Sequence, residues 1–190
     1  MFRRIFGAGH EPAADQAQAA LSGAESTIGD TATVRRIVAR LEAMPPERAR
    51  LVASAAYTLA RVANADLVIS DEETAMIERE LQADGGLDEA TAVLVAEMAK
   101  LQARTVGATE DYVVTREFAA LATETQKVDV LRACYVVSAA NGSISAEESA
   151  EVNQIANELA LDAAIVSRIR AEFHDRLSAV QEVRRLAQGR

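Results

Sequence analysis

The chain has 190 residues, of which 49% are hydrophobic, 4% are aromatic and none is Trp, and its formal net charge is -9. One cysteine excludes a disulfide framework within the chain, and no apolar run approaches the roughly 18 residues of a membrane span. Residues 51–160 carry seven Lys/Arg and nineteen Asp/Glu, an acidity that disfavours nucleic acid, whose phosphates are neutralised by Lys and Arg. Because abundant alanine and few aromatic residues favour closely packed helices over sheets, we predict an all-α protein. The single cysteine and the lack of a membrane-spanning run predict that it is cytoplasmic.

Residues 1–32 are predicted to form a flexible leader, because residues 8–32 mix Ala, Gly, Gln, Ser and acidic residues without a sustained apolar period. The opening sequence MFRRIFG is basic and apolar, but it is too short for the hydrophobic part of a signal peptide. A segment of this composition can make peripheral contact with an anionic membrane surface. We therefore expect any membrane contact to be peripheral, at the inner face of the membrane and through this leader.

Residues 33–190 are predicted to form one helical domain. An apolar period begins in TVRRIVARLEAM, and PPERAR then ends that helix and starts the next one, with Pro46 in its first turn. Small and branched apolar residues recur in this second helix at steps of three and four: Val52, Ala55, Ala56, Leu59, Val62 and Ala63. The following helix is expected to begin after Ser70, to face Ile77 and Leu81 inward, and to end at the glycines of ADGG.

The helix in LDEATAVLVAEMAKLQA is expected to start with Asp88 as its cap and to keep Val93, Leu94 and Met98 in phase. A helix around EDYVVTREFAALA follows, and then VDVLRACYVVSAA, an amphipathic helix and LDAAIVSRIRAEF repeat the earlier order. Seven or eight helices are therefore expected. Cys134 lies between apolar neighbours on one of them, which predicts packed core and not a nucleophile.

The stretches RVANADLVISDEE (residues 61–73) and VVSAANGSISAEE (residues 136–148) share one pattern, and we call them the first joint and the second joint. Six residues match in register: Val62, Ala65, Ile69, Ser70, Glu72 and Glu73 with Val137, Ala140, Ile144, Ser145, Glu147 and Glu148. This spacing indicates an internal duplication, with copies around residues 46–104 and 126–175. Because similar amphipathic units bury their faces best against each other, we expect a pseudo-twofold arrangement of the two copies.

Each joint contains a capping box, formed by Ser70 with Glu73 and by Ser145 with Glu148. In such a box the serine oxygen accepts a hydrogen bond from the third helical N–H, and the glutamate accepts from the N–H of the serine. Gly142 is suited to the left-handed conformation that ends the preceding helix. In the first joint Leu67 occupies the same place, at a conformational cost.

The acidic joints are also a candidate site for a divalent cation, because carboxylate and amide oxygens suit Ca²⁺, Mg²⁺ or Mn²⁺. The candidate ligands are Asp66, Glu72, Glu73, Asn141, Glu147 and Glu148. The pattern is not an EF-hand, because Val62 and Val137 stand where the first acidic ligand of that loop belongs. The alternative explanation of these acids is that carboxylates are favoured at the positive end of a helix.

ANADLVISDEE and AANGSISAEE resemble the paired A-D-G-x-I-S-x-E-E signatures of the TerB-like family of tellurite-resistance proteins, and the MFRRIFG start is similar to that family as well. The resemblance covers roughly residues 33–173. It implies an all-helical, duplicated cytoplasmic fold, a part in bacterial responses to tellurite and other stresses, and a metal-binding acidic cluster. The signature departs from the family at ADL in residues 65–67 and at ANG in residues 140–142. A related module accompanies some J-domain co-chaperones, but their His-Pro-Asp tripeptide is absent here.

Together these features predict a non-enzymatic module that binds a protein partner with a basic surface and is tuned by a divalent cation. No catalytic residue and no organic cofactor are expected. Two alternatives stay open, a metal-dependent hydrolase that uses the clustered carboxylates and a structural adaptor without an ion. A pocket lined by Asp66, Glu72 and Glu147 would favour the hydrolase, and an exposed acidic face would favour the adaptor.

Overall fold

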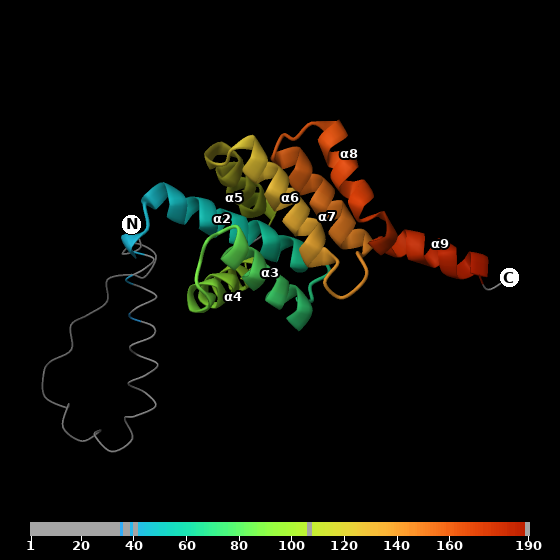
Figure 1. The fold of residues 1–190 in the computed structure, drawn as a ribbon, viewed down its shortest axis with the longest axis horizontal. Helices are drawn as coiled ribbons and strands as arrows, with labels where there is room; N and C mark the ends of the chain where they lie inside the picture. Colours follow the sequence, from blue (N-terminus) through green and yellow to red (C-terminus); the bar gives the residue numbers. More distant parts are fainter. Residues whose placement is uncertain (1–34, 36–38, 40–41, 106–107, 189–190) are drawn as a thin grey trace, which may run out of the picture. The chain divides into compact units, whose positions relative to one another are not determined.

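The computed structural model describes residues 35, 39, 42–105 and 108–188, and this part of the chain is all-α (Figure 1). It contains eight α-helices and one 3-10 helix: α2 (Pro46–Ala63), α3 (Asp71–Ala83), α4 (Glu89–Thr105), α5 (Ala108–Leu121), α6 (Glu124–Ser138), α7 (Ala146–Glu158), α8 (Ala163–Glu172), η2 (His174–Arg176) and α9 (Ser178–Gln188). No strand occurs among these residues. The predicted all-α class is confirmed, and the described residues form eight α-helices, within the predicted seven or eight.

The chain divides into two units, Met1–Pro45 and Pro46–Arg190, and all the helices above belong to the second. The predicted flexible leader lies outside the described residues, and so does most of the helix expected from TVRRIVARLEAM. The predicted domain boundary near residue 33 stays a prediction. No helix in the described ranges is long and apolar enough to cross a membrane.

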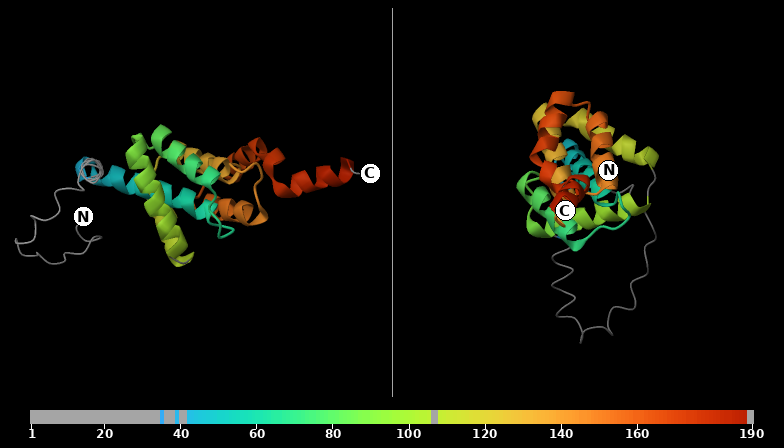
Figure 2. Two further views of the ribbon diagram at one scale, coloured as in Figure 1. Left: turned by 90° about the horizontal axis from the view of Figure 1, so that it is seen from below. Right: turned by 90° about the vertical axis from the view of Figure 1, so that its right-hand side faces the viewer.

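Helices α2 and α6 run through the middle of the second unit. Helix α2 packs against α3, α4, α5, α6 and α7, and α6 packs against α2, α3, α7 and α8. Two further views place α3 and α4 on one side of this central pair and α7 and α8 on the other (Figure 2). Helix α9 extends away from the bundle, and none of its residues is buried.

Alanine sets how closely α2 and α4 approach each other. The fully buried side chains of these two helices include Ala56, Ala60 and Ala63 on α2 and Ala92 and Ala96 on α4. Small residues at a contact let two helix backbones come close. The predicted apolar face of α4 is wrong at Val93, which is 39% exposed, whereas Leu94 and Met98 are half-buried beside the alanines. Side chains larger than alanine at this contact would hold α2 and α4 too far apart.

An ionic cluster around Arg61 ties the first copy to the second. Arg61 lies on α2 and is only 5% exposed. Its guanidinium forms ion pairs with Glu151 and Glu158 of α7, the latter at 2.6 Å, and donates to Thr115 of α5 at 3.0 Å. Burial alone would raise the pKa of Glu158, but hydrogen bonds from Arg61 and Gln154 and the charge of Arg61 outweigh it and lower that pKa. Removing one partner of this cluster would leave an uncompensated buried charge.

The two joints have the same local backbone structure. Leu67 and Gly142 both have positive φ, at 68° and 99°, and the N–H of each closes a turn at 2.9 Å. One helix later, Gly86 and Ala160 are a second matched pair, at 62° and 55°. The duplication read from the sequence therefore extends to the backbone, including the predicted left-handed Leu67. The pseudo-twofold relation of the copies stays a prediction.

Both predicted capping boxes are present. The Ser70 Oγ accepts from the Glu73 N–H at 3.2 Å, and the Glu73 carboxylate accepts from the Ser70 N–H at 2.7 Å. The matching distances in the second joint are 3.0 and 2.8 Å. The sequence analysis did not anticipate a third box, in which Thr123 and Gln126 start α6.

Ser70→Ala and Ser145→Ala are each expected to lower the free energy of unfolding by about 1 kcal/mol, because each substitution leaves a helix N–H without its acceptor. Thr125→Ala is the matched control, since Thr125 is exposed in the first turn of α6 and is not the cap. Urea denaturation of the three variants measures the effect. Midpoints for both serine variants equal to that of the parent would contradict the capping role.

Candidate functional site

Side-chain oxygens of Asp66 and Asn141 are used inside the joints. The Asp66 Oδ1 accepts from the Val68 N–H at 2.9 Å, and the Asn141 Oδ1 accepts from the Ser143 N–H at 3.2 Å. These contacts are Asx turns, in which a side chain two residues upstream replaces a backbone carbonyl. Each of the two residues is exposed and stabilises its own loop while keeping one further side-chain group toward solvent.

Glu73 and Glu148 meet in the interior of the bundle. They are 3% and 2% exposed, and the Glu73 carboxyl is close enough to Glu148 to raise its pKa. No group in the described part of the chain donates to the Glu148 Oε1. Burial, and then the neighbouring Glu73 carboxyl, raise the pKa of Glu148 to about 7, against the opposing hydrogen bonds from Ser145. A buried carboxyl group beside a second one is disfavoured in its charged form, so Glu148 keeps its proton to a higher pH than an exposed glutamate does.

The structure separates the six candidate metal ligands into two sets. Glu73 and Glu148 are brought together and buried, whereas the other four are exposed: Asp66, Glu72, Asn141 and Glu147. Within residues 42–105 and 108–188, no three or more His, Cys, Asp or Glu side chains are arranged to hold a metal ion. A cation site at the joints stays a prediction, with Glu72 and Glu147 as the ligands that capping leaves available.

The first joint is open and the second joint is covered. Leu67 is 82% exposed and Val68 is 67% exposed. Their counterparts in the second joint, Gly142 and Ser143, are half-buried. The sequence contained one signal of this difference, a leucine at a position that requires left-handed backbone, but it did not reveal what covers the second joint.

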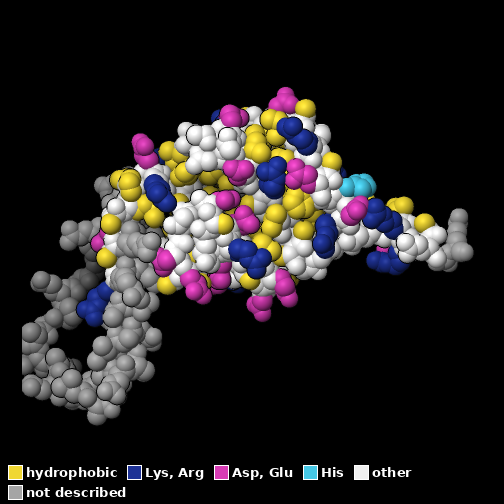
Figure 3. Space-filling view, viewed as in Figure 1, with side chains coloured by type: hydrophobic (Ala, Val, Ile, Leu, Met, Phe, Trp, Pro, Cys, Tyr) yellow, Lys and Arg dark blue, Asp and Glu magenta, His cyan; other side chains and the backbone are white. Residues whose placement is uncertain are grey.

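Exposed carboxylates surround the open joint. Asp66, Asp71 and Glu72 are exposed there, whereas the second joint has Asn141, Ala146 and Glu147 at the equivalent positions. Acidic side chains also line the lower edge of the face shown in Figure 3, where α3 and α4 lie. The first joint therefore exposes an apolar tip, formed by Leu67 and Val68, among negatively charged side chains.

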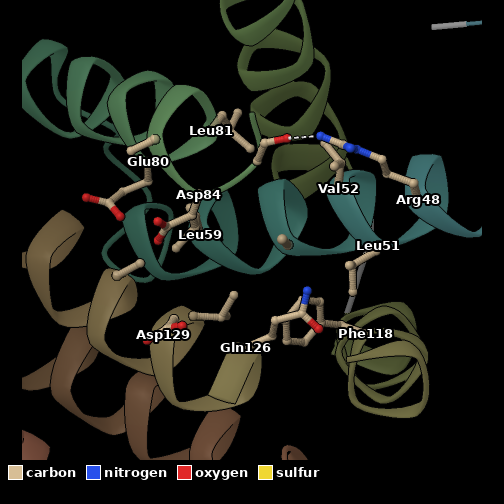
Figure 4. Close-up of a pocket in the computed structure, with 15 residues that line it drawn as sticks. Arg48, Leu51, Val52, Leu59, Glu80, Leu81, Asp84, Phe118, Gln126 and Asp129 are labelled. Carbon is tan, nitrogen blue, oxygen red and sulfur yellow. Dashed lines mark hydrogen bonds between the residues drawn. The ribbon is translucent and has the colours of Figure 1, made fainter. Parts of the chain in front are cut away.

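A cavity of about 500 Å³ lies between α2, α3, α5 and α6 (Figure 4). Apolar side chains such as Leu51, Leu59 and Phe118 form its walls. Acidic Glu80, Asp84 and Asp129 also line it, and burial, followed by the charge of Asp84, raises the pKa of Glu80. None of the six candidate ligands of the joints lines this cavity.

Cys134 is fully buried, as the sequence predicted for a core residue. Burial raises the pKa of its thiol to about 12. The thiolate is the nucleophilic form of cysteine, so this thiol is unreactive near neutral pH.

The free energy of unfolding is expected to fall as the pH rises from about 5 to 8, by about 2 kcal/mol, because folded Glu148 keeps a proton that the unfolded chain has lost. Glu148→Gln should remove most of this dependence and stabilise the chain at pH 8. Glutamine keeps the capping box, since Gln126 makes the same contact at 2.9 Å in α6. Thermal unfolding at several pH values measures both effects.

Glu147→Gln is the control for this titration, because Glu147 is the exposed neighbour of Glu148 and should leave the pH dependence in place. A Glu148→Gln variant whose stability falls with pH as steeply as that of the parent would show that another group carries the titration.

Comparison with known proteins bears on the same part of the chain. The family model described as "Tellurite resistance protein TerB" matches residues 52–171, from α2 to α8 with both joints included. No curated protein and no solved structure matched the chain. The matched segment holds the duplicated helices, the two capping boxes and the buried carboxyl pair described above. The chain belongs to the TerB family of tellurite resistance proteins.

Proposed function

We propose that this chain is a non-enzymatic protein-interaction module of the bacterial cytoplasm that acts in resistance to tellurite and related stresses. The observation that carries the proposal is Leu67, which is 82% exposed with φ at 68°. Left-handed backbone costs a residue with a side chain about 1–2 kcal/mol. Glycine fills the same place in the second joint without that cost. Strained backbone is concentrated at functional sites, and an exposed apolar side chain there supports a role in binding a protein partner.

The charge around Leu67 favours a basic partner. Asp66, Asp71 and Glu72 are all exposed beside it, and none forms an ion pair among the described residues. Complementary charge around an apolar contact speeds association and disfavours wrong partners. A partner with Lys or Arg around an apolar pocket fits this surface.

The exposure of the joint acids also supports binding over hydrolysis. A hydrolase would need the carboxylates of Asp66, Glu72 and Glu147 to converge in a pocket with a general base. These three residues are exposed, and the cavity of the bundle is lined by others.

A growth experiment tests the proposed role. It uses the organism that encodes the chain, with the chromosomal gene for the chain deleted. The parent gene should restore growth on potassium tellurite, and Leu67→Gly/Val68→Ser should not, because it removes the apolar tip. Folding should survive, since both new residues already stand at these positions in the second joint. Growth is measured at matched protein levels.

Leu101→Ser is the control for this growth experiment, because Leu101 is 62% exposed on α4 and lies outside both joints. It should restore growth as the parent does. A deletion strain that grows normally on tellurite would refute the tellurite role. Full rescue by the joint variant would refute the role of the first joint.

The proposed tuning by a cation rests on Glu72 and Glu147, whose carboxylates are exposed and not used in capping. Calorimetric titration with Ca²⁺, Mg²⁺, Mn²⁺ and Zn²⁺ is expected to reveal binding of one hard cation. Glu72→Gln/Glu147→Gln should weaken that binding about tenfold or more, because each substitution removes a charged oxygen ligand. Ser70→Ala should leave it unchanged. Equal binding by the glutamine variant and the parent would remove these two ligands from the proposal.

A further inference from the structure

The second joint shows how an extended segment docks on this loop. The Ile144 N–H donates to the carbonyl of Arg176 at 2.7 Å, and the Ser178 N–H donates to the carbonyl of Ile144 at 2.9 Å. Leu177, which lies between these two partners, is 9% exposed, and Ile144 is 1% exposed. The Gln181 side chain adds a bond to the Gly142 carbonyl at 3.1 Å. One residue of the loop is thus paired, on both of its backbone groups, with a short parallel segment.

The first joint offers the same backbone without such a partner. Ile69 is the counterpart of Ile144, and it makes no backbone hydrogen bond within the part of the chain that the structure describes. It is also only half-buried, next to the exposed Leu67 and Val68. Loop conformation does not explain this difference, because the turns and the capping boxes of the two joints match. What differs is the presence of a segment like Arg176–Ser178.

We propose that the first joint binds an extended segment of a partner protein, which pairs with the N–H and C=O of Ile69 as residues 176–178 pair with Ile144. This proposal rests on the proposed function and specifies the form of its partner. Main-chain pairing of this kind supplies affinity, and the side chains beside it supply specificity. The bound segment carries a leucine-sized residue in the place of Leu177 and basic residues next to it.

Charge distinguishes this partner from the segment that covers the second joint. The second joint has one exposed carboxylate, that of Glu147, at the positions where the first joint has Asp66, Asp71 and Glu72. The segment on the second joint includes both acidic and basic residues, among them Asp175 and Arg176. A segment for the first joint is therefore expected to be richer in Lys and Arg, and its binding is expected to weaken with salt.

A labelled peptide that binds to the full chain tests the proposal. The peptide copies residues 173–188 with Asp175 replaced by Lys, and it carries an acetylated N-terminus and a fluorescent label. It should bind at low salt more tightly than a scrambled peptide of the same composition. The second joint keeps its own segment, because an intramolecular partner has an effective concentration in the millimolar range. Binding should also protect the Ile69 amide from hydrogen exchange, which a contact through side chains alone would not do.

Two variants test whether the peptide binds at the first joint. In each of them, first-joint residues are replaced by their counterparts from the second joint. Leu67→Gly/Val68→Ser should weaken binding about tenfold, as expected when apolar contacts are lost. Asp66→Asn/Asp71→Ala should weaken it severalfold and reduce its salt dependence. The control Glu47→Gln/Glu89→Gln removes two exposed charges at the far ends of α2 and α4 and should change nothing.

Three outcomes of the peptide experiments would overturn the proposal. These are a peptide that binds no better than its scrambled form, an Ile69 amide that exchanges as in the free chain, and joint variants that bind like the parent. Sedimentation that reveals self-association through the first joint would also overturn it, in favour of a second copy of this chain. The growth experiment reports separately on the proposed function. If the peptide does not bind but the Leu67→Gly/Val68→Ser variant fails to restore growth, the proposed function stands and only the binding of an extended segment is excluded.

Discussion

The contact between Glu73 and Glu148 is the constraint on which the rest of the bundle depends. Each glutamate closes the capping box of its own helix, and each is buried because the two helix starts meet in the interior. Neither side chain can move into solvent without opening its cap. The proton that Glu148 keeps near neutral pH thus links the start of α7 to a titration that the neighbouring Glu73 shifts upward.

Two further interactions hold the bundle together around this contact. Buried alanines let α2 approach α4 closely, and Arg61 extends from α2 to two glutamates of α7. The alanine contacts are apolar and close within the first copy, whereas the arginine cluster is ionic and joins the first copy to the second. Aromatic side chains add to this packing: Tyr135 and Phe118 are buried, and Tyr135 stacks on Phe173 within the second copy.

The two joints show how a duplicated unit acquires different surfaces. Their turns and caps are the same, but the second is covered by η2 and the start of α9, while the first exposes Leu67 and Val68 among carboxylates. The substitutions at residues 66, 67, 68 and 71, which are exposed in the first joint, leave the shared turns and caps intact. The proposed binding role of the first joint follows from this asymmetry, since the second joint shows that the same loop accepts an extended segment.

Local patterns in the sequence determined much of this protein. The all-α class, both capping boxes, the left-handed Leu67 and the family resemblance depend on neighbouring residues, whose spacing is visible in one dimension. Tertiary structure alone decided that α4 packs by its alanines, that Glu73 lies against Glu148, and that residues 176–178 cover one joint and not the other. These are contacts between residues far apart in the chain, and they depend on how closely whole helices approach, which periodicity within a single helix does not encode.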